Sequence, residues 1–245
     1  MRARSPSRKL KRASLYWGVA EQDSNDAPRL LRLAPSAALK EKRLASLLQG
    51  REHENARLAA AVMRAQAVGS LALAGIEATP AELERWEGAR SAVDEHAPFT
   101  VSGLLAWHRA VTGSAAGLRT TERSRDGGPP PAPAEFVGTR LRNLEEWLNV
   151  GSGADLKPSP RGALALARIV EILPFDDGNG RVARLAASHV MVGAGARAPV
   201  LTSEDRQRLV QSLQAAFQLR TELLASLLDE AAERALDVMI RTLEG

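Results

Sequence analysis

The sequence predicts an all-α fold with one small β-hairpin. Aromatic residues make up only 4% of the 245 residues and hydrophobic residues 44%, so Leu, Val and Ala must fill the core. Ala and Leu are strong helix formers, which favours helices. Apolar residues also recur at helical spacing, most clearly in the i, i+4, i+7, i+11 stripe of Val137, Leu141, Leu144 and Leu148.

The first half of the chain contains four further helical segments. Residues 37–49 and 52–70 have helical composition. Pro80 can open the next helix, because proline is favoured at the first helical position. Thr100 can cap the one after it, since a threonine side chain accepts a hydrogen bond from the first turn.

The second half continues in the same way. Pro158 or Pro160 starts a helix that must end before Pro174, because the residue before a proline is disfavoured in the α conformation. The range 180–192 reads as the next helix. Thr202 or Ser203 caps another, and helical composition continues to about Leu243.

One segment, residues 117–133, does not follow the helical pattern. It contains threonines, charged residues, an Asp126-Gly127 pair and consecutive prolines. An Asp-Gly pair between short extended segments predicts a hairpin turn. The same composition also suits an irregular loop, and both interpretations stay open.

Charge and composition narrow the possible partners. The net charge is +4, and much of the excess lies in the first twelve residues, so we expect 1–36 to be a basic, partly disordered segment. The chain has no apolar run long enough for a membrane span. No aromatic interleaving or known motif supports nucleic-acid binding. The absence of cysteine excludes disulfides and, with the missing span, leads us to expect a cytoplasmic protein.

The stretch DDGNGR, residues 176–181, is the candidate binding site. Gly178 and Gly180 permit a backbone that points several N–H groups into one concavity, and a helix N-terminus adds more. Arg181 and Arg184 project from one side of the first turn. A carboxylate at 176 or 177 fits beside a phosphate if Mg²⁺ lies between them. The residues therefore predict a site for magnesium and a polyphosphate, or else a polar turn that only caps a helix.

The longer stretch LPFDDGNGRVAR, residues 173–184, resembles the signature of the Fic family, His-Pro-Phe-x-Asp/Glu-Gly-Asn-Gly-Arg-x-x-Arg, at every defined position except the first. The resemblance extends to LAWHR at 105–109, to the flap segment near Arg119–Pro133 and to the helix 136–149. It covers roughly residues 60–220. It implies a Fic-type helical domain over 37–245 with a β-hairpin flap, and an enzyme that transfers AMP from ATP to a protein hydroxyl.

The resemblance also implies a role for each motif residue. Asp177 would hold Mg²⁺ against the phosphates, and the target protein would lie along the flap. The remaining nucleotide-binding positions would be Phe175, Gly178, Asn179, Gly180, Arg181 and Arg184. Family members often have a Tyr-Tyr pair near residues 206–217, but the only tyrosine here is Tyr16.

Leu173 stands where the family has its general base. A leucine cannot accept a proton from the target hydroxyl, and none of the four histidines is an obvious substitute. We therefore expect no intact catalytic residue and at most trace transfer. Leu173 is either a natural divergence or an introduced replacement, and the sequence does not separate the two.

Glu77 is a candidate for self-inhibition. Many Fic proteins carry a helix with the pattern Ser/Thr-x-x-x-Glu-Gly/Asn, whose glutamate pairs with the second motif arginine. Residues 73–78 resemble this pattern with Leu73 at the serine position and Ala78 at the Gly/Asn position. Glu77 would then face Arg184, unless it is an ordinary surface residue.

Three functions agree with the sequence. The chain is an adenylyltransferase that lacks its base, a non-catalytic module that senses nucleotide, or a scaffold that binds a protein through its flap or its basic segment.

Overall fold

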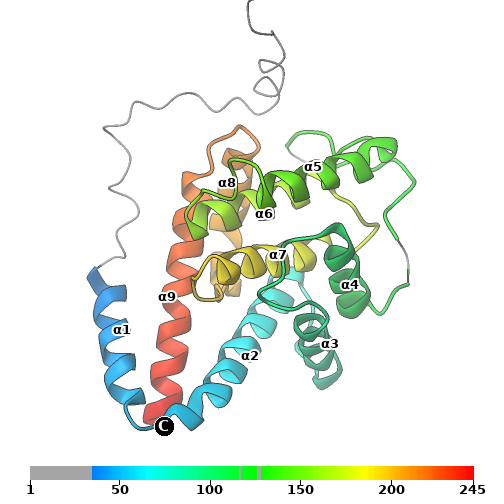
Figure 1. Ribbon diagram of the computed structural model, residues 1–245. Coiled ribbons are helices and arrows are strands. Elements are labelled where there is room, and N and C mark those ends of the chain that lie inside the picture. The colour runs from blue at the N-terminus through cyan, green and yellow to red at the C-terminus, as the bar shows by residue number, and fades with distance from the viewer. Residues whose placement is uncertain (1–34, 116, 126–127) are drawn as a thin grey trace, which may run out of the picture.

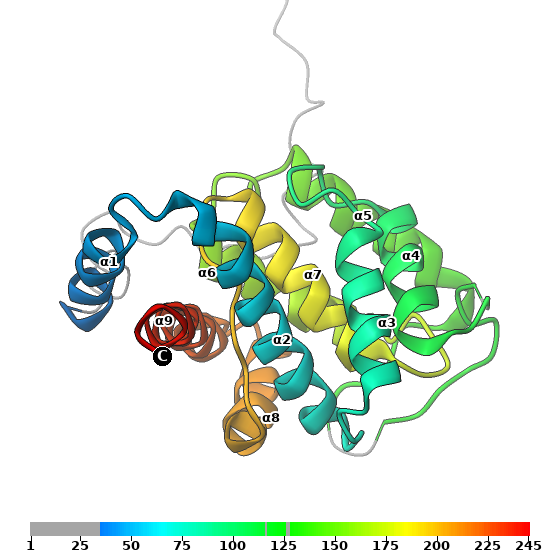
Figure 2. The same ribbon diagram turned by 90° about the horizontal axis from the view of Figure 1, so that it is seen from below.

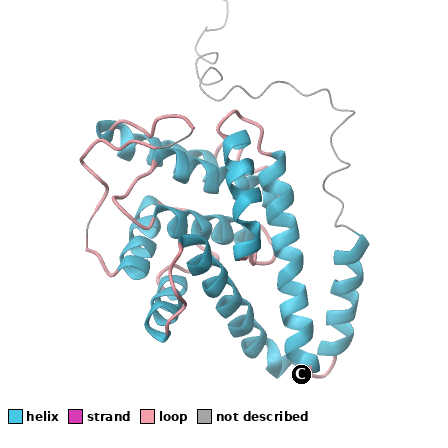
Figure 3. Cartoon of the chain, turned by 180° about the vertical axis from the view of Figure 1, so that it is seen from behind, coloured by secondary structure: helices cyan, strands magenta, loops and turns pink. Residues whose placement is uncertain are grey.

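Helices make up the regular secondary structure of the described residues. The computed structural model describes residues 35–115, 117–125 and 128–245, and within these ranges it has nine α-helices, three 3-10 helices and no strand (Figures 1 and 3). The α-helices are α1 (Pro35–Leu48), α2 (Asn55–Ala74), α3 (Pro80–Ser91), α4 (Val101–Thr112), α5 (Val137–Asn149), α6 (Pro158–Ile172), α7 (Asn179–Gly193), α8 (Arg206–Ala216) and α9 (Glu222–Glu244). The 3-10 helices are η1 (Glu52–Glu54), η2 (Ala134–Phe136) and η3 (Ser203–Asp205). The predicted all-α class is confirmed.

The helices begin and end where local signals place them. Thr100 Oγ1 accepts a hydrogen bond from Gly103 N at 3.0 Å, which caps α4 as predicted. The carboxylate of Asp205 accepts one from Thr202 N at 2.8 Å and fixes the turn that leads into α8. Gly113 ends α4 in the left-handed conformation, with φ at 68°.

The α6–α7 pair forms the centre of the bundle. Small residues on α6 and α7, including Ala163, Ala183 and Ala187, are fully buried and allow close approach of the two helices. Helices α1 and α9 lie on one side of α7 and α3 and α4 on the other (Figure 2). The predicted stripe on α5 is buried throughout: Val137, Leu141, Leu144 and Leu148.

Helix α1 packs against the C-terminal half of α9, apart from the main core (Figure 1). Leu44 and Leu236 belong to this smaller apolar cluster. The Lys40 ammonium adds ion pairs to Glu233 and Asp237, both at 2.8 Å. Residues 1–34 lie outside the described residues, and so does nearly all of the predicted basic segment. Among the described helices, none has the length and hydropathy needed to cross a membrane.

The described residues of the segment 117–133 form a loop without a strand, and its arginines contact the last turn of α6. The predicted hairpin is therefore not observed, and its turn at Asp126-Gly127 lies outside the described residues. Pro129 and its two proline neighbours have no N–H group to donate to a ladder. The backbone carbonyls of Thr121 and Ala132 are instead taken by the Arg119 guanidinium. We call residues 117–133 the flap segment.

Candidate functional site

The loop of residues 173–178 joins α6 to α7 and starts at a strained residue. Leu173 ends α6 in the left-handed conformation, with φ 54° and ψ 62°, and its N–H donates to Ile169 O at 3.0 Å. This conformation costs a residue other than glycine about 1–2 kcal/mol. The helix thus ends before Pro174, as predicted, and its end depends on contacts that hold Leu173 in place.

Two side chains fix the middle of the loop. The Asn179 side chain accepts from Phe175 N at 2.9 Å and donates to Phe175 O at 2.8 Å, so it closes the loop on itself. Phe175 is buried, and its ring stacks on His108 with centroids 3.9 Å apart. His108 Nε2 also lies 3.2 Å from Asp177 O. His108 therefore helps to hold this loop in place.

Gly178 turns the loop into α7. Its φ is 77°, and a Cβ at this position would lie 2.7 Å from Thr112 Cγ2, so a side chain is excluded by both conformation and space. Gly178 provides no capping side chain, and the N–H groups of Asn179, Gly180 and Arg181 have no acceptor within α7. Such a helix start attracts an anion.

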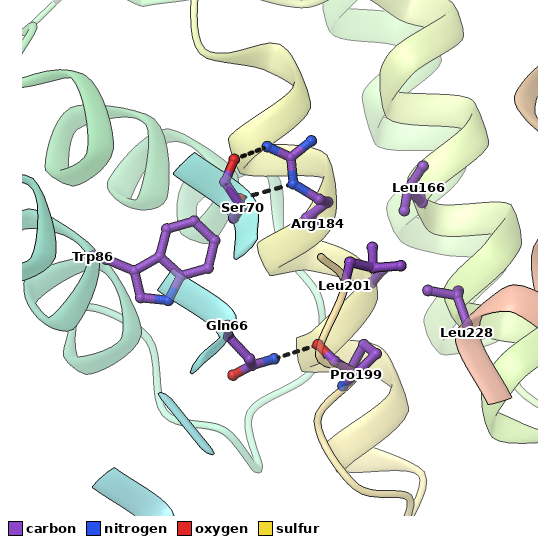
Figure 4. Close-up of a pocket in the computed structure, with 9 residues that line it drawn as sticks. Gln66, Ser70, Trp86, Leu166, Arg184, Pro199, Leu201 and Leu228 are labelled. Carbon is purple, nitrogen blue, oxygen red and sulfur yellow. Dashed lines mark hydrogen bonds between the residues drawn. The ribbon is translucent and has the colours of Figure 1, made fainter. Parts of the chain in front are cut away.

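Arg181 and Arg184 differ in how they are held. Arg181 is 7% exposed; its guanidinium donates to Val111 O and lies 3.4 Å from the Asp177 carboxylate. Arg184 donates to Ser70 Oγ and to Ser70 O, each at 2.8 Å (Figure 4). It forms no ion pair with any carboxylate in the described part of the chain.

The surroundings of Arg184 determine its pKa. Burial, together with the nearby charges of Arg181 and Arg206, lowers the pKa of Arg184 to about 9. A guanidinium normally stays charged far above this range. No carboxylate of a described residue compensates this cation, and a bound anion would do so.

Asp177 fits the role of a magnesium ligand. Its side chain is 86% exposed and lies next to the start of α7, where a phosphate would be bound. Mg²⁺ in phosphate sites is typically held by one or two carboxylates plus phosphate oxygens, and it needs no cage of protein ligands. Within the described residues no group of three or more acidic or histidine side chains gathers, so any magnesium would depend on the phosphate for most of its ligands.

Three arginines of the flap segment contact the motif loop or the helices beside it, and the sequence did not predict these contacts. Arg119 is 3% exposed and donates to Leu173 O at 2.6 Å and Ile172 O at 3.2 Å, besides its two contacts within the flap. Arg123 pairs with Asp176 at 2.6 Å. Arg125 donates to Val170 O and lies over the Phe217 ring, 4.9 Å from its centroid.

Residues 98–191 match the sequence model of the Fic/DOC family. This part of the chain is a Fic domain. The match contains α4, the flap segment, α5, α6, the motif loop and nearly all of α7. It confirms the family resemblance predicted from LPFDDGNGRVAR.

Known proteins with a Fic domain resemble longer parts of the chain. Protein adenylyltransferase fic-1 of Caenorhabditis elegans is 34% identical over 126 residues, which are 50% of this chain and 25% of that protein. Protein adenylyltransferase Fic of Drosophila melanogaster is 27% identical over 147 residues, 58% of this chain and 30% of that protein. The chain thus spans only about a quarter to a third of the length of these curated relatives.

Solved structures share the fold. A Fic-domain-containing signaling protein of Bacteroides thetaiotaomicron has a TM-score of 0.71 at 19% identity, covering 86% of this chain and 98% of that one. Fic-1 of C. elegans, residues 134–508, has a TM-score of 0.63 at 22% identity, covering 85% and 74%. The fold of the Fic domain therefore extends beyond the segment matched by the family model.

Glu77 does not pair with Arg184 in this Fic domain. It is exposed and forms no ion pair with a described residue. The partner of Arg184 on α2 is Ser70, and α2 ends at Ala74 with Gly75 in the left-handed conformation. The pattern Ser/Thr-x-x-x-Glu-Gly/Asn therefore fits better from Ser70 to Gly75, with Ala74 in place of the glutamate.

Ala74→Glu is expected to stabilise the protein by about 1 kcal/mol, because residue 74 lies one turn beyond Ser70 and its carboxylate would face Arg184. The cost of an acidic residue at a helix C-terminus, about 0.3–1 kcal/mol, is smaller than this ion pair. Arg184 would lower the pKa of the new carboxyl group, so the gain should be present at pH 7 and lost as the pH falls through that pKa. Urea unfolding at pH 7 and pH 3 measures this. Glu77→Ala serves as the control, and we expect no change; a gain for Ala74→Glu that persists at pH 3 would contradict the pairing.

Proposed function

We propose that this Fic domain binds Mg²⁺-ATP at the start of α7 and, for lack of a base at position 173, transfers AMP to protein hydroxyls at most in traces. The observation that carries the proposal is the Arg184 guanidinium, half-buried beside Arg181 near a helix N-terminus and without a carboxylate partner among the described residues. Nucleotide polyphosphate is the anion that fits a loop of this family. The two adenylyltransferase relatives support the choice of ATP.

Several motif residues then have a role in binding the nucleotide. The N–H groups at the start of α7 and the guanidinium of Arg184 would neutralise phosphate oxygens, while Asp177 would hold Mg²⁺ against them. Bound Mg²⁺ would supply positive charge to the pyrophosphate that leaves when AMP is transferred. Arg181 donates a hydrogen bond to Val111 O, so it would orient the loop as well as add positive charge to the site.

Leu173 cannot take the proton of the target hydroxyl, and His108 and His189 are not placed to replace the missing histidine. Leu173 has no lone pair, and His108 is stacked against Phe175 and bonded to the loop backbone. His189 packs edge-on against Trp107, with ring centroids 5.1 Å apart, and burial lowers the pKa of His189. We infer that the chain binds nucleotide without transferring it efficiently, and that a target protein would contact the flap segment.

Mg²⁺-ATP should raise the free energy of unfolding, by about 2.7 kcal/mol at a concentration one hundred times the dissociation constant. Asp177→Asn should remove the magnesium dependence of this stabilisation, because the carboxylate is the proposed metal ligand. Asp177 is exposed, so the variant should fold normally. Calorimetry and thermal unfolding with ATP, with and without Mg²⁺, measure both effects.

The matched control is Asp176→Asn, which changes the neighbouring carboxylate that pairs with Arg123. We expect it to bind Mg²⁺-ATP like the unaltered chain. The proposal fails if the unaltered chain binds no ATP in the presence of magnesium, or if both variants lose magnesium dependence equally.

A further inference from the structure

Arg206 lies close to the proposed phosphate site but belongs to a different part of the chain from the motif. It is the first residue of α8, and its guanidinium donates to Ala72 O at 2.6 Å. Ala72 is two residues beyond Ser70, whose backbone carbonyl and hydroxyl hold Arg184. Two guanidinium groups are therefore held by the last turn of α2, where the helix dipole is negative.

The charges of this cluster are not balanced. Neither Arg184 nor Arg206 forms an ion pair with a carboxylate among the residues that the structure describes. Arg181 has only the exposed Asp177 carboxylate at 3.4 Å and that of Glu82 at 4.0 Å. Arg184 and Arg206 lie near each other because their partners on α2, Ser70 and Ala72, are two residues apart, and the charges of Arg181 and Arg206 help to lower the pKa of Arg184. Among the described residues, neutral oxygens of Ser70 and Ala72 hold Arg184 and Arg206, so the cluster favours a ligand with several negative charges.

We propose that Arg206 is a third phosphate-binding cation, which makes the site prefer a linear triphosphate to a diphosphate. This inference rests on the proposed nucleotide site and names the part of the ligand that the site selects. The N–H groups at the start of α7 and Arg181 would bind the phosphates nearest the loop. Arg184 lies one turn further along α7. Arg206 adds positive charge beside Arg184 from α8, where a terminal phosphate would extend.

The competing interpretation is that Arg206 only holds the end of α2 in place. Two substitutions separate these roles. Arg206→Gln keeps an N–H donor for Ala72 O but removes the charge, whereas Arg206→Lys keeps the charge. Arg208, two residues further along α8, is an exposed arginine bound to Glu230 by two contacts of 2.7 Å, and Arg208→Gln is the matched control.

The experiment is titration calorimetry of the full chain with inorganic tripolyphosphate and with pyrophosphate, at fixed Mg²⁺ and ionic strength. Arg206→Gln should weaken tripolyphosphate binding by about tenfold, the effect of one charge-assisted contact, and pyrophosphate binding by less than about twofold. Arg206→Lys should stay within about threefold for both probes, and Arg208→Gln should change neither.

Equal loss of both probes in Arg206→Gln, or no loss, would overturn the proposal, and so would the absence of tripolyphosphate binding to the unaltered chain. Because the probes contain no nucleoside, this experiment tests the phosphate site independently of the proposed binding of ATP. If the chain binds tripolyphosphate with the expected response to Arg206→Gln but does not bind Mg²⁺-ATP, the nucleotide proposal fails and the role of Arg206 stands.

Discussion

Leu173→His is expected to increase the transfer of AMP from Mg²⁺-ATP to protein by about 10²–10⁴-fold, the usual contribution of a general base. The backbone is suited to the change. Position 173 has a φ of 54°, and histidine is several-fold enriched in left-handed conformations relative to most residues, so the loop need not move. The variant should become labelled, or should label added protein, when it is incubated with ATP that carries a labelled α-phosphate.

The control for this variant must separate the base from the backbone. Leu173→Asn also adopts the left-handed conformation easily but has no group that accepts a proton near neutral pH. We expect it to fold at least as stably as the unaltered chain and to show no gain in labelling. Labelling by Leu173→His should rise with pH through the imidazole pKa, near 6.5, because the neutral ring is the base. A histidine variant that binds Mg²⁺-ATP and still labels nothing would contradict an adenylyltransferase site.

The helices were predictable because their signals are local. Thr100 caps α4, the α5 stripe is buried and α6 ends before Pro174, since each depends on residues within one or two turns. The glycines of the motif were predictable for the same reason. Gly178 has a positive φ and no room for a Cβ, so its position requires glycine, and a short motif is enough to predict this.

The contacts between distant segments were not predictable in this way. The Ser70–Arg184 contact joins residues 114 positions apart, so it depends on how α2 packs against α7. The match of residues 73–78 to the inhibitory pattern depends on Glu77, which is exposed and forms no ion pair with a described residue. For the flap, the Asp-Gly pair left a hairpin and a loop both open; the described residues form no strand, and the proline run and the contacts of Arg119 oppose strand pairing.

Arg119→Ala is expected to destabilise the protein by about 3–5 kcal/mol, because several buried carbonyls lose a charged donor and each such loss costs about 1–3 kcal/mol. The guanidinium is 3% exposed and serves four carbonyls, so its loss leaves those of Thr121, Ala132, Ile172 and Leu173 without this donor. Buried carbonyls without partners are costly. Urea unfolding measures the loss. Arg119→Lys should show a smaller loss than Arg119→Ala, because an ammonium keeps the charge but not the planar fork of donors.

Arg123→Ala is the matched control on the same flap segment. Its partner is Asp176, and the two side chains are 41% and 55% exposed, so the change should cost no more than about 1 kcal/mol. If Arg119→Ala costs no more than Arg123→Ala, Arg119 is not what holds the flap to the loop. A large difference would mean that a single guanidinium fixes both the path of the flap and the strained conformation of Leu173. Loss of Arg119 should then also abolish the gain expected from Leu173→His, because the introduced imidazole would no longer be held in place.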